Sequence, residues 1–304
     1  SRPSLGLLAA AILLSGCGGG GVGSTPNPTP SPSPTPTPVP TPSLLNVTAS
    51  QTFRHDLATS TASFSTTGGA TLTDGSVTSG TISYDVGTRG YTLALGARTQ
   101  TFLPTDIDTT RSNAQVTVYV KTNGTTTDTL TLTKPGLSGR MTYQYVGGAL
   151  WQHRENNAAN TIIATEAFSY GFSLNTSDLF TPTVGSATFE FDLLGAVSTA
   201  NDVLSISGQG TAFADFKRQA IIIRGTTNLP TGPELFEAAA QMSILGTSFS
   251  GAFTLGAFTG STSGQLYRTL DAPEIGASFY GEARDGRLAV GGINGRSTPP
   301  NASN

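Results

Sequence analysis

The sequence predicts an all-β protein whose folded body has two parts, and three observations support this prediction. Alternating apolar and polar residues recur along most of the chain, as they do in half-buried strands. Glycine and proline are frequent, at 37 and 18 of 304 residues, whereas methionine is rare, at 2. No stretch carries a convincing helical stripe, and the best candidate, Pro233–Ala240, is short and could equally open a strand.

The beginning of the chain has the features of a bacterial secretion signal. No charged residue occurs between Arg2 and Arg54, and the apolar run Leu5–Leu14 lies within this gap. Ten helical residues span about 15 Å, half of the roughly 30 Å of a bilayer core. We therefore expect a lipoprotein-type signal peptide over residues 1–16, N-terminally clipped because the initiator Met and most of a basic segment are absent.

Leu14-Ser15-Gly16-Cys17 resembles the lipobox of bacterial lipoproteins, and Cys17 is the only cysteine in the chain. A thiol can form the thioether to a diacylglycerol, and small residues before it give a peptidase access to the bond. The resemblance implies that Cys17 carries palmitate-type acyl chains, two or more of which anchor a protein stably. Gly18, which is not Asp, implies sorting to the outer membrane. The alternative is an ordinary signal peptide with an incidental cysteine.

Residues 17–43 are expected to form a disordered Gly/Pro-rich linker. Nine of the 18 prolines fall between Pro26 and Pro42, at every second position. Such a run adopts extended polyproline II at roughly 3.1 Å per residue, so the segment would span about 50 Å. A stalk behind a lipid anchor is the favoured interpretation, and an SH3-type ligand is the alternative.

Residues 44–184 are expected to form a β-rich domain that contains two hairpins. Asn123-Gly124 is a two-residue turn signal between Thr117–Val120 and the alternating segment Thr129–Thr133. A second hairpin is predicted around Gly87–Arg89.

Residues 185–297 are expected to form an eight-stranded antiparallel up-and-down barrel, followed by a disordered tail over 298–304. Short strands divided by turn-like segments favour this architecture, and eight strands leave an interior that side chains can just fill. The predicted strands are Ser186–Gly195, Val203–Phe213, Ala220–Thr226, Glu237–Ser243, Thr247–Leu255, Gly264–Arg268, Glu274–Ala283 and Arg287–Gly295. The side chains expected to fill the barrel are Phe189, Phe191, Phe213, Phe249, Phe253 and Phe279.

Four segments of this region resemble the barrel of transferrin-binding-protein-B-like bacterial surface lipoproteins, a group that includes the factor-H-binding-protein-like lipoproteins. The segments are Gly208–Phe216, Gly246–Gly251, Gly264–Tyr267 and Ala272–Gly281. The resemblance covers residues 185–297 and, more loosely, 143–186. It implies a handle domain over 44–184 that packs on the barrel.

The chain also departs from this family. It has room for one lobe where the transferrin receptors have two, and Tyr267-Arg268-Thr269 stands where the family has Tyr-Gly-Pro. The partner-binding loops of the family are not recognisable. The resemblance therefore implies the fold and the cellular location, but it does not imply transferrin binding.

Composition and motifs argue against several functional classes. With 16 Lys and Arg against 19 Asp and Glu, the chain cannot neutralise many phosphates, so we expect no nucleic-acid partner. The two histidines, His55 and His153, are far apart in sequence and suggest no metal site. No nucleophile elbow or phosphate loop occurs, so we expect a protein that is not an enzyme and holds no resident cofactor.

Trp151-Gln152-His153-Arg154 is the one cluster that we select for ligand contact, through Trp151, His153 and Arg154. The alternative is an edge-strand aromatic residue beside a polar turn. Glu274, beside Gly276, is expected to be a structural carboxylate that stabilises a turn, not a catalytic one.

We therefore expect a non-catalytic protein, anchored by lipid to the bacterial outer membrane at the cell surface, with the periplasmic face as the alternative. It would bind a macromolecular partner or an iron- or haem-type cargo through loops on a rigid barrel. One alternative is a structural envelope lipoprotein without a nutrient ligand. A surface hydrolase is the remaining alternative.

Overall fold

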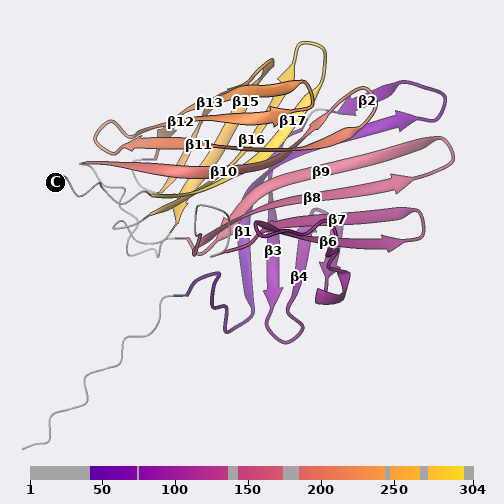
Figure 1. Ribbon diagram of the computed structural model, residues 1–304, viewed down its shortest axis with the longest axis horizontal. Helices are drawn as coiled ribbons and strands as arrows, with labels where there is room; N and C mark the ends of the chain where they lie inside the picture. Colours follow the sequence, from indigo (N-terminus) through magenta and orange to yellow (C-terminus); the bar gives the residue numbers. More distant parts are fainter. Residues whose placement is uncertain are drawn as a thin grey trace, which may run out of the picture. The chain divides into compact units, whose positions relative to one another are not determined.

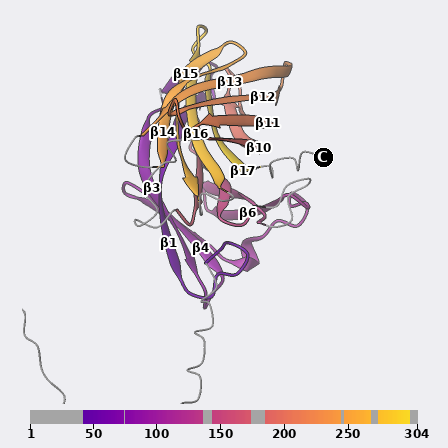
Figure 2. The same ribbon diagram turned by 90° about the vertical axis from the view of Figure 1, so that its left-hand side faces the viewer.

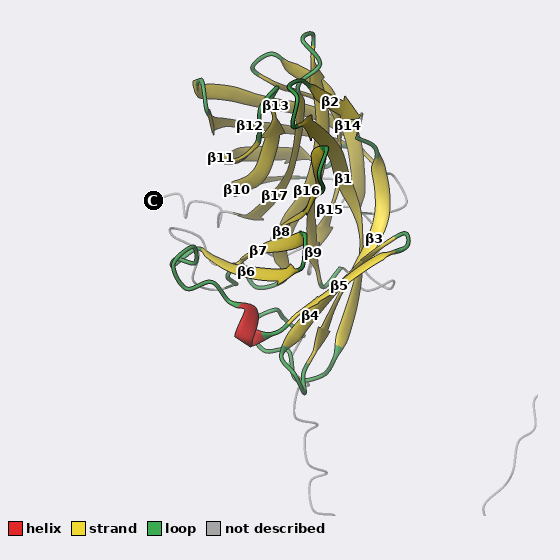
Figure 3. Cartoon of the chain, turned by 90° about the vertical axis from the view of Figure 1, so that its right-hand side faces the viewer, coloured by secondary structure: helices red, strands yellow, loops and turns green. Residues whose placement is uncertain are grey.

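Strands make up most of the described chain, as the sequence predicts. The structure is a computed structural model that describes residues 42–73, 75–135, 143–173, 185–243, 247–267 and 273–297. Figure 3 shows strands joined by loops, with one short 3-10 helix among the described residues, η1 at Pro104–Asp106. Cys17, the predicted signal peptide and tail, and most of the predicted linker lie outside the described residues.

Within the described ranges, no helix is long and apolar enough to cross a membrane.

The first part of the body is an antiparallel nine-stranded sheet, called the handle sheet below. Its strands are β1 Gln51–Ser65, β2 Ala70–Thr73, β3 Val77–Asp85, β4 Gly90–Leu95, β5 Arg98–Phe102, β6 Val116–Asn123, β7 Thr126–Thr133, β8 Val146–Asn156 and β9 Asn160–Gly171. They follow the order β5-β4-β3-β1-β9-β8-β7-β6, and β2 pairs with β1. The two hairpins predicted from sequence are confirmed as β3–β4 and β6–β7.

The handle sheet curls until its two edge strands, β5 and β6, come close to each other. Lys121 Nζ on β6 donates a hydrogen bond of 2.9 Å to the carbonyl of Thr101 on β5. Ile107, after η1, forms an isolated bridge with Tyr119 on β6. One face of the sheet therefore encloses an aromatic-rich core, which contains Phe53, Leu57, Ile82, Leu93, Phe102, Tyr119, Leu130, Leu132, Ala149, Trp151, Phe168 and Tyr170.

The second part is a closed barrel of eight antiparallel strands, which confirms the predicted architecture. The strands are β10 Ser186–Ser198, β11 Val203–Asp215, β12 Ala220–Leu229, β13 Gly232–Met242, β14 Ser248–Leu255, β15 Phe258–Tyr267, β16 Glu274–Ala283 and β17 Leu288–Ser297. Each pairs with the next in sequence, and β17 closes the barrel against β10. Figures 1 and 2 show β10 to β13 side by side in this order.

Five of the six phenylalanines predicted to fill the barrel are buried in its core, whereas the prediction for Phe213 is wrong. Phe213 points outward and is 45% exposed. The interior positions of this part of β11 are held by the small residues Gly210, Ala212 and Ala214. A Cβ added at Gly210 would lie 2.7 Å from Phe191 Cζ, so a large side chain has no room there. Phe236 and Phe258 fill interior positions that sequence analysis did not select.

The predicted strand bounds differ most from the structure at two places in the barrel. Strand β13 begins at Gly232, so the segment Pro233–Ala240, the best helix candidate, is extended throughout. Strand β15 begins at Phe258, so the stretch 260–263, which resembles a turn, lies inside a strand. Small residues are tolerated there because every second one faces solvent or a close neighbouring strand.

Glu274 joins the barrel to the handle as a structural carboxylate. It is 1% exposed and lies at the start of β16. Its carboxylate accepts backbone N–H groups from Gln144 at 2.9 Å and from Tyr145 and Val146 at 2.7 and 2.9 Å. The expected structural role is confirmed, although Glu274 stabilises the chain that leads into β8 and not a turn in its own strand.

The outer faces of β1, β8 and β9 meet the outer wall of the barrel through a separate apolar cluster. It contains Ala58, Ala62, Leu150, Ile163, Ala167, Ala196, Val203 and Val290. Gly276 allows close approach here, since a Cβ at this position would lie 2.5 Å from Ser169 Oγ on β9. The inner face of the handle sheet is thereby left free to carry its own side-chain cluster.

Candidate functional site

A network of polar side chains lies on the inner face of the handle sheet. It consists of Arg98 on β5, Asp128 on β7, Trp151 and His153 on β8 and Glu166 on β9, and is called the inner polar cluster below. Strand pairing places Asp128 directly opposite His153, and Trp151 directly opposite Glu166. These side chains share the face that encloses the aromatic core, because residues two apart in a strand point the same way.

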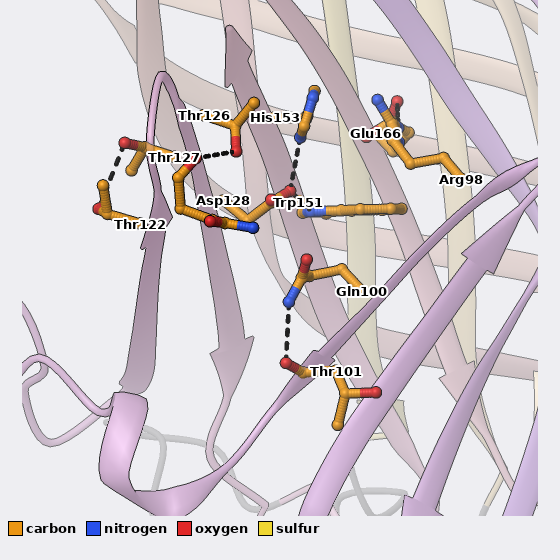
Figure 4. A network of polar contacts seen from close by, with 11 residues as sticks. Arg98, Gln100, Thr101, Thr122, Thr126, Thr127, Asp128, Trp151, His153 and Glu166 are labelled. Carbon is orange, nitrogen blue, oxygen red and sulfur yellow. Dashed lines mark hydrogen bonds and ion pairs between the residues drawn. The ribbon is translucent and has the colours of Figure 1, made fainter.

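Asp128 orients two of the three residues predicted for ligand contact. Its Oδ1 accepts hydrogen bonds from Trp151 Nε1 and from His153 Nδ1, both at 2.9 Å (Figure 4). An ionised carboxylate has no proton to donate, so it accepts the hydrogen bond from His153. In the neutral imidazole, the proton of His153 is therefore on Nδ1. The Nε2 atom then has a free lone pair, and the His153 side chain is 24% exposed.

Glu166 and Arg98 form the second half of the cluster. Glu166 is 2% exposed, and its Oε1 pairs with Arg98 Nη2. The guanidinium of Arg98 also lies over the Trp151 ring, 4.1 Å from the ring centroid. Arg98 therefore connects edge strand β5 to β8 and β9 across the inside of the curled sheet.

Burial dominates the protonation of Glu166. Desolvation raises the pKa of its carboxyl to about 7, although the neighbouring Arg98 charge and hydrogen bond act to lower it. A carboxyl with this pKa is partly protonated at neutral pH. His55, on the same inner face, stacks on Phe168 with ring centroids 3.8 Å apart. Its burial lowers its pKa to about 3, so His55 stays neutral.

The structure separates Arg154 from the other two predicted residues. Arg154 points to the opposite face of β8, where its Nη2 lies 3.4 Å from Asp202 Oδ1 in the β10–β11 turn of the barrel. Trp151 is 1% exposed and β8 lies between β9 and β7, so the alternative of an edge-strand aromatic residue is also wrong. Of the predicted set, only His153 presents an accessible group on the inner face.

Sequence analysis missed Asp128, Glu166 and Arg98. Asp128 occupies the same strand face as Leu130 and Leu132, and a charged residue on an apolar face of an alternating strand is a detectable signal. Glu166 gives the same signal, since it alternates with Phe168 and Tyr170. Arg98 gives none, because its role depends on the curl that brings β5 toward β9.

A single oriented histidine suits some ligands better than others. A histidine that binds a metal usually donates its second ring N–H to a carboxylate, and this is the arrangement of His153 and Asp128. Haem iron needs one or two axial ligands from the protein, because the porphyrin supplies the rest. Among the described residues, no group of three or more His, Cys, Asp or Glu is placed to hold a bare metal ion.

Comparison with protein-family models finds no match for this chain. Comparison with curated proteins finds none either. Among solved structures, the chain is similar to a protein of unknown function of the DUF3598 family from Nostoc punctiforme, with 9% identity and a TM-score of 0.22. That alignment covers 81% of this chain and 95% of the other. The eight-stranded barrel is confirmed by its own strand pairing, and the relation to transferrin-binding-protein-B-like lipoproteins stays a prediction.

Proposed function

We propose that this chain is a lipid-anchored protein of the bacterial outer surface, similar to the transferrin-binding-protein-B-like type, that binds a haem-type cargo through His153. The observation that carries the proposal is the Asp128–His153 pair. Asp128 fixes the ring orientation and leaves Nε2 available at a partly exposed position. Nothing in this function requires catalysis.

The partners of the two carboxylates in the inner polar cluster support the non-catalytic version of the proposal. Asp128 is held by Trp151 and His153, and Glu166 is paired with Arg98. A hydrolase of the two-carboxylate type needs an acid and a nucleophile or base that face a substrate in a cleft. Both carboxylates are instead 5% exposed or less and serve as supports for neighbouring side chains.

The packed barrel supports a cargo site in the handle. The barrel core is filled by aromatic and aliphatic side chains from all eight strands, among them Phe191, Phe236, Phe253 and Phe279. An eight-stranded barrel can hold a small ligand only if its interior is left open. This packing supports the proposal that the cargo binds at the inner polar cluster and not inside the barrel.

A titration of the folded protein with ferric haem, followed by its visible absorbance, tests the proposal. We expect saturable binding, with His153→Ala weakening it severely and Asp128→Asn weakening it by about 10- to 100-fold through loss of histidine orientation. Arg154→Ala is the matched control on the same strand, because Arg154 points to the other face. Binding that is equally tight in all four proteins would exclude His153 as the ligand.

A macromolecular partner is the second candidate, and an exposed apolar line on the barrel wall favours it. Phe213 and Ile222 are 45% and 44% exposed and lie directly opposite each other on β11 and β12. Ala239 and Ala252 continue the line across β13 and β14. If this wall binds an iron carrier, the immobilised double variant Phe213→Ser with Ile222→Ser should capture less transferrin or haemoglobin than the immobilised wild-type protein. Equal or absent capture by both would remove this candidate.

A further inference from the structure

A cleft of about 360 Å³ lies where the base of the β6–β7 hairpin faces the barrel wall. Gln115, Val116 and Thr133 line it from the handle, and residues of β10, β11, β12 and β17 line it from the barrel. Pockets for small organic ligands have volumes of roughly 300 to 1,000 Å³, so this cleft is at the lower end of that range. It does not include the inner polar cluster.

The buried floor of the cleft contains the side-chain amide of Asn294 on β17. Asn294 is 0% exposed, and neither its Oδ1 nor its Nδ2 is paired with any part of the chain that the structure describes. Leaving a buried polar group unpaired costs about 1 to 3 kcal/mol, so an apolar residue would be more stable here. A ligand that enters the cleft could supply the hydrogen bonds that this amide lacks.

The handle strand β8 leaves room for this amide. A Cβ added at Gly148 would lie 2.6 Å from Asn294 Oδ1 and 3.3 Å from Thr133 Cγ2. The backbone N–H of Gly148 donates to Thr133 Oγ1 at 2.8 Å, which fixes that hydroxyl beside the amide. Asn294 and Thr133 thus form a polar floor whose shape depends on glycine at position 148.

The remaining groups around the cleft determine the chemistry of its ligand. Gln115, Gln209 and Asn228 are exposed amides at the rim, and each can both donate and accept hydrogen bonds. Asp192 supplies a carboxylate, and its Oδ2 accepts a hydrogen bond of 2.6 Å from the hydroxyl group of Tyr143. Among the described residues that line the cleft there is no lysine or arginine, so an anion would find no countercharge.

We infer that this cleft binds a neutral polyhydroxylated ligand, a mono- or disaccharide, whose hydroxyl groups satisfy Asn294 and the amides of the rim. Hydroxyl groups donate and accept as amides do, which matches the lining. Val116 and Leu194, both partly buried, supply an apolar wall for the C–H face of a sugar ring. This inference is independent of haem binding, because the residues that it uses are different.

Ligand-observed NMR and calorimetry on the full chain test this inference. The probes are glucose, galactose, mannose, N-acetylglucosamine, trehalose and sucrose at millimolar concentrations, with gluconate as the anionic counterpart of glucose. We expect at least one neutral sugar to bind and gluconate not to bind. Asn294→Leu should weaken the sugar at least about tenfold, because the floor loses its donor and acceptor.

Two further measurements show whether a loss of binding comes from unfolding. Asn294→Leu should unfold at the same temperature as wild type or higher, since it removes an unpaired amide and keeps the branched shape of the side chain. Gln152→Leu, an amide on β8 outside the cleft, is the matched control and should bind the sugar as wild type does. The inference fails if no neutral sugar of the panel binds, if Asn294→Leu binds it equally well, or if gluconate binds as tightly as glucose.

Discussion

Glu166 and His55 are buried titratable side chains whose effects on stability oppose each other as pH changes. Burial raises the pKa of Glu166 from 4.5 to about 7 and lowers that of His55 from 6.5 to about 3. The contribution of Glu166 is present below pH 4.5 and is lost as pH rises through about 7. The contribution of His55 is present above pH 6.5 and is lost as pH falls through about 3.

Between pH 4.5 and 6.5 the two slopes therefore cancel, and each single variant should reveal the other residue. Relative to wild type, the unfolding free energy of Glu166→Gln should gain a positive slope of about 1.4 kcal/mol per pH unit. His55→Gln should gain a negative slope of similar size. Denaturant titrations across this pH range measure both slopes. Profiles that stay parallel to wild type would mean that these side chains are not buried as described.

A carboxylate that accepts three backbone N–H groups should be sensitive to the loss of its charge alone. Glu274→Gln keeps the shape of the side chain but places an amide NH₂ among the donors of residues 144–146. We expect the unfolding free energy to fall by about 3 kcal/mol. Thermal and denaturant unfolding measure this loss, with the exposed Glu282→Gln on the same strand as control. Equal stability of the two variants would contradict the role of Glu274 in joining the barrel to the handle.

The face of the barrel on which a phenylalanine lies determines how much it stabilises the fold. Phe213 faces outward, so Phe213→Ser should change the unfolding free energy by no more than about 0.5 kcal/mol. Phe253 is 2% exposed and packs against Phe236 and Phe279, so Phe253→Ala should cost about 3 to 5 kcal/mol. Equilibrium denaturation compares the two. A large loss for Phe213→Ser would mean that β11 is shifted by one residue, since such a shift turns every side chain to the other face.

Elements whose pattern is local can be predicted from the sequence. Strand bounds and side-chain orientations that depend on pairing with distant strands cannot. Strand Glu274–Ala283 has the predicted bounds, and the turn at Asp285-Gly286, which the sequence predicts, follows it directly. The start of β15 cannot be found in this way, since Gly260 and its Ser and Thr neighbours are typical of a turn and become strand only by pairing with β14 and β16. Phe213 shows the same limit, because the face on which it lies is set by the pairing of β11 with β10 and β12.

The candidate site was predictable to a similar extent. His153 is conspicuous as one of two histidines, and Asp128 could have been found as a charge on the apolar face of β7. The approach of Arg98 to Trp151 and Glu166 requires the handle sheet to curl, which no local pattern encodes. Likewise, only the packing of handle against barrel reveals that the side-chain amide of Asn294 has no hydrogen-bond partner among the described residues.

For the molecule as a whole, we propose that Cys17 attaches the protein to the membrane. We predict that Cys17→Ser moves the protein from the membrane fraction to the soluble fraction, because no acyl chain can then be attached. Haem binding by the released protein should be unchanged, since Cys17 is distant in sequence from the described body. Fractionation with immunoblotting measures the distribution. Membrane association that persists in the variant would argue against a lipid anchor.

We propose that His153, held in orientation by its hydrogen bond to Asp128, binds the haem iron. Electron paramagnetic resonance of the ferric haem complex tests it directly, because the signal reports the axial ligand of the iron. We expect a histidine-ligated signal in wild type and in Arg154→Ala that disappears in His153→Ala. An unchanged histidine signal in His153→Ala, or no specific complex with the wild-type protein, would contradict it.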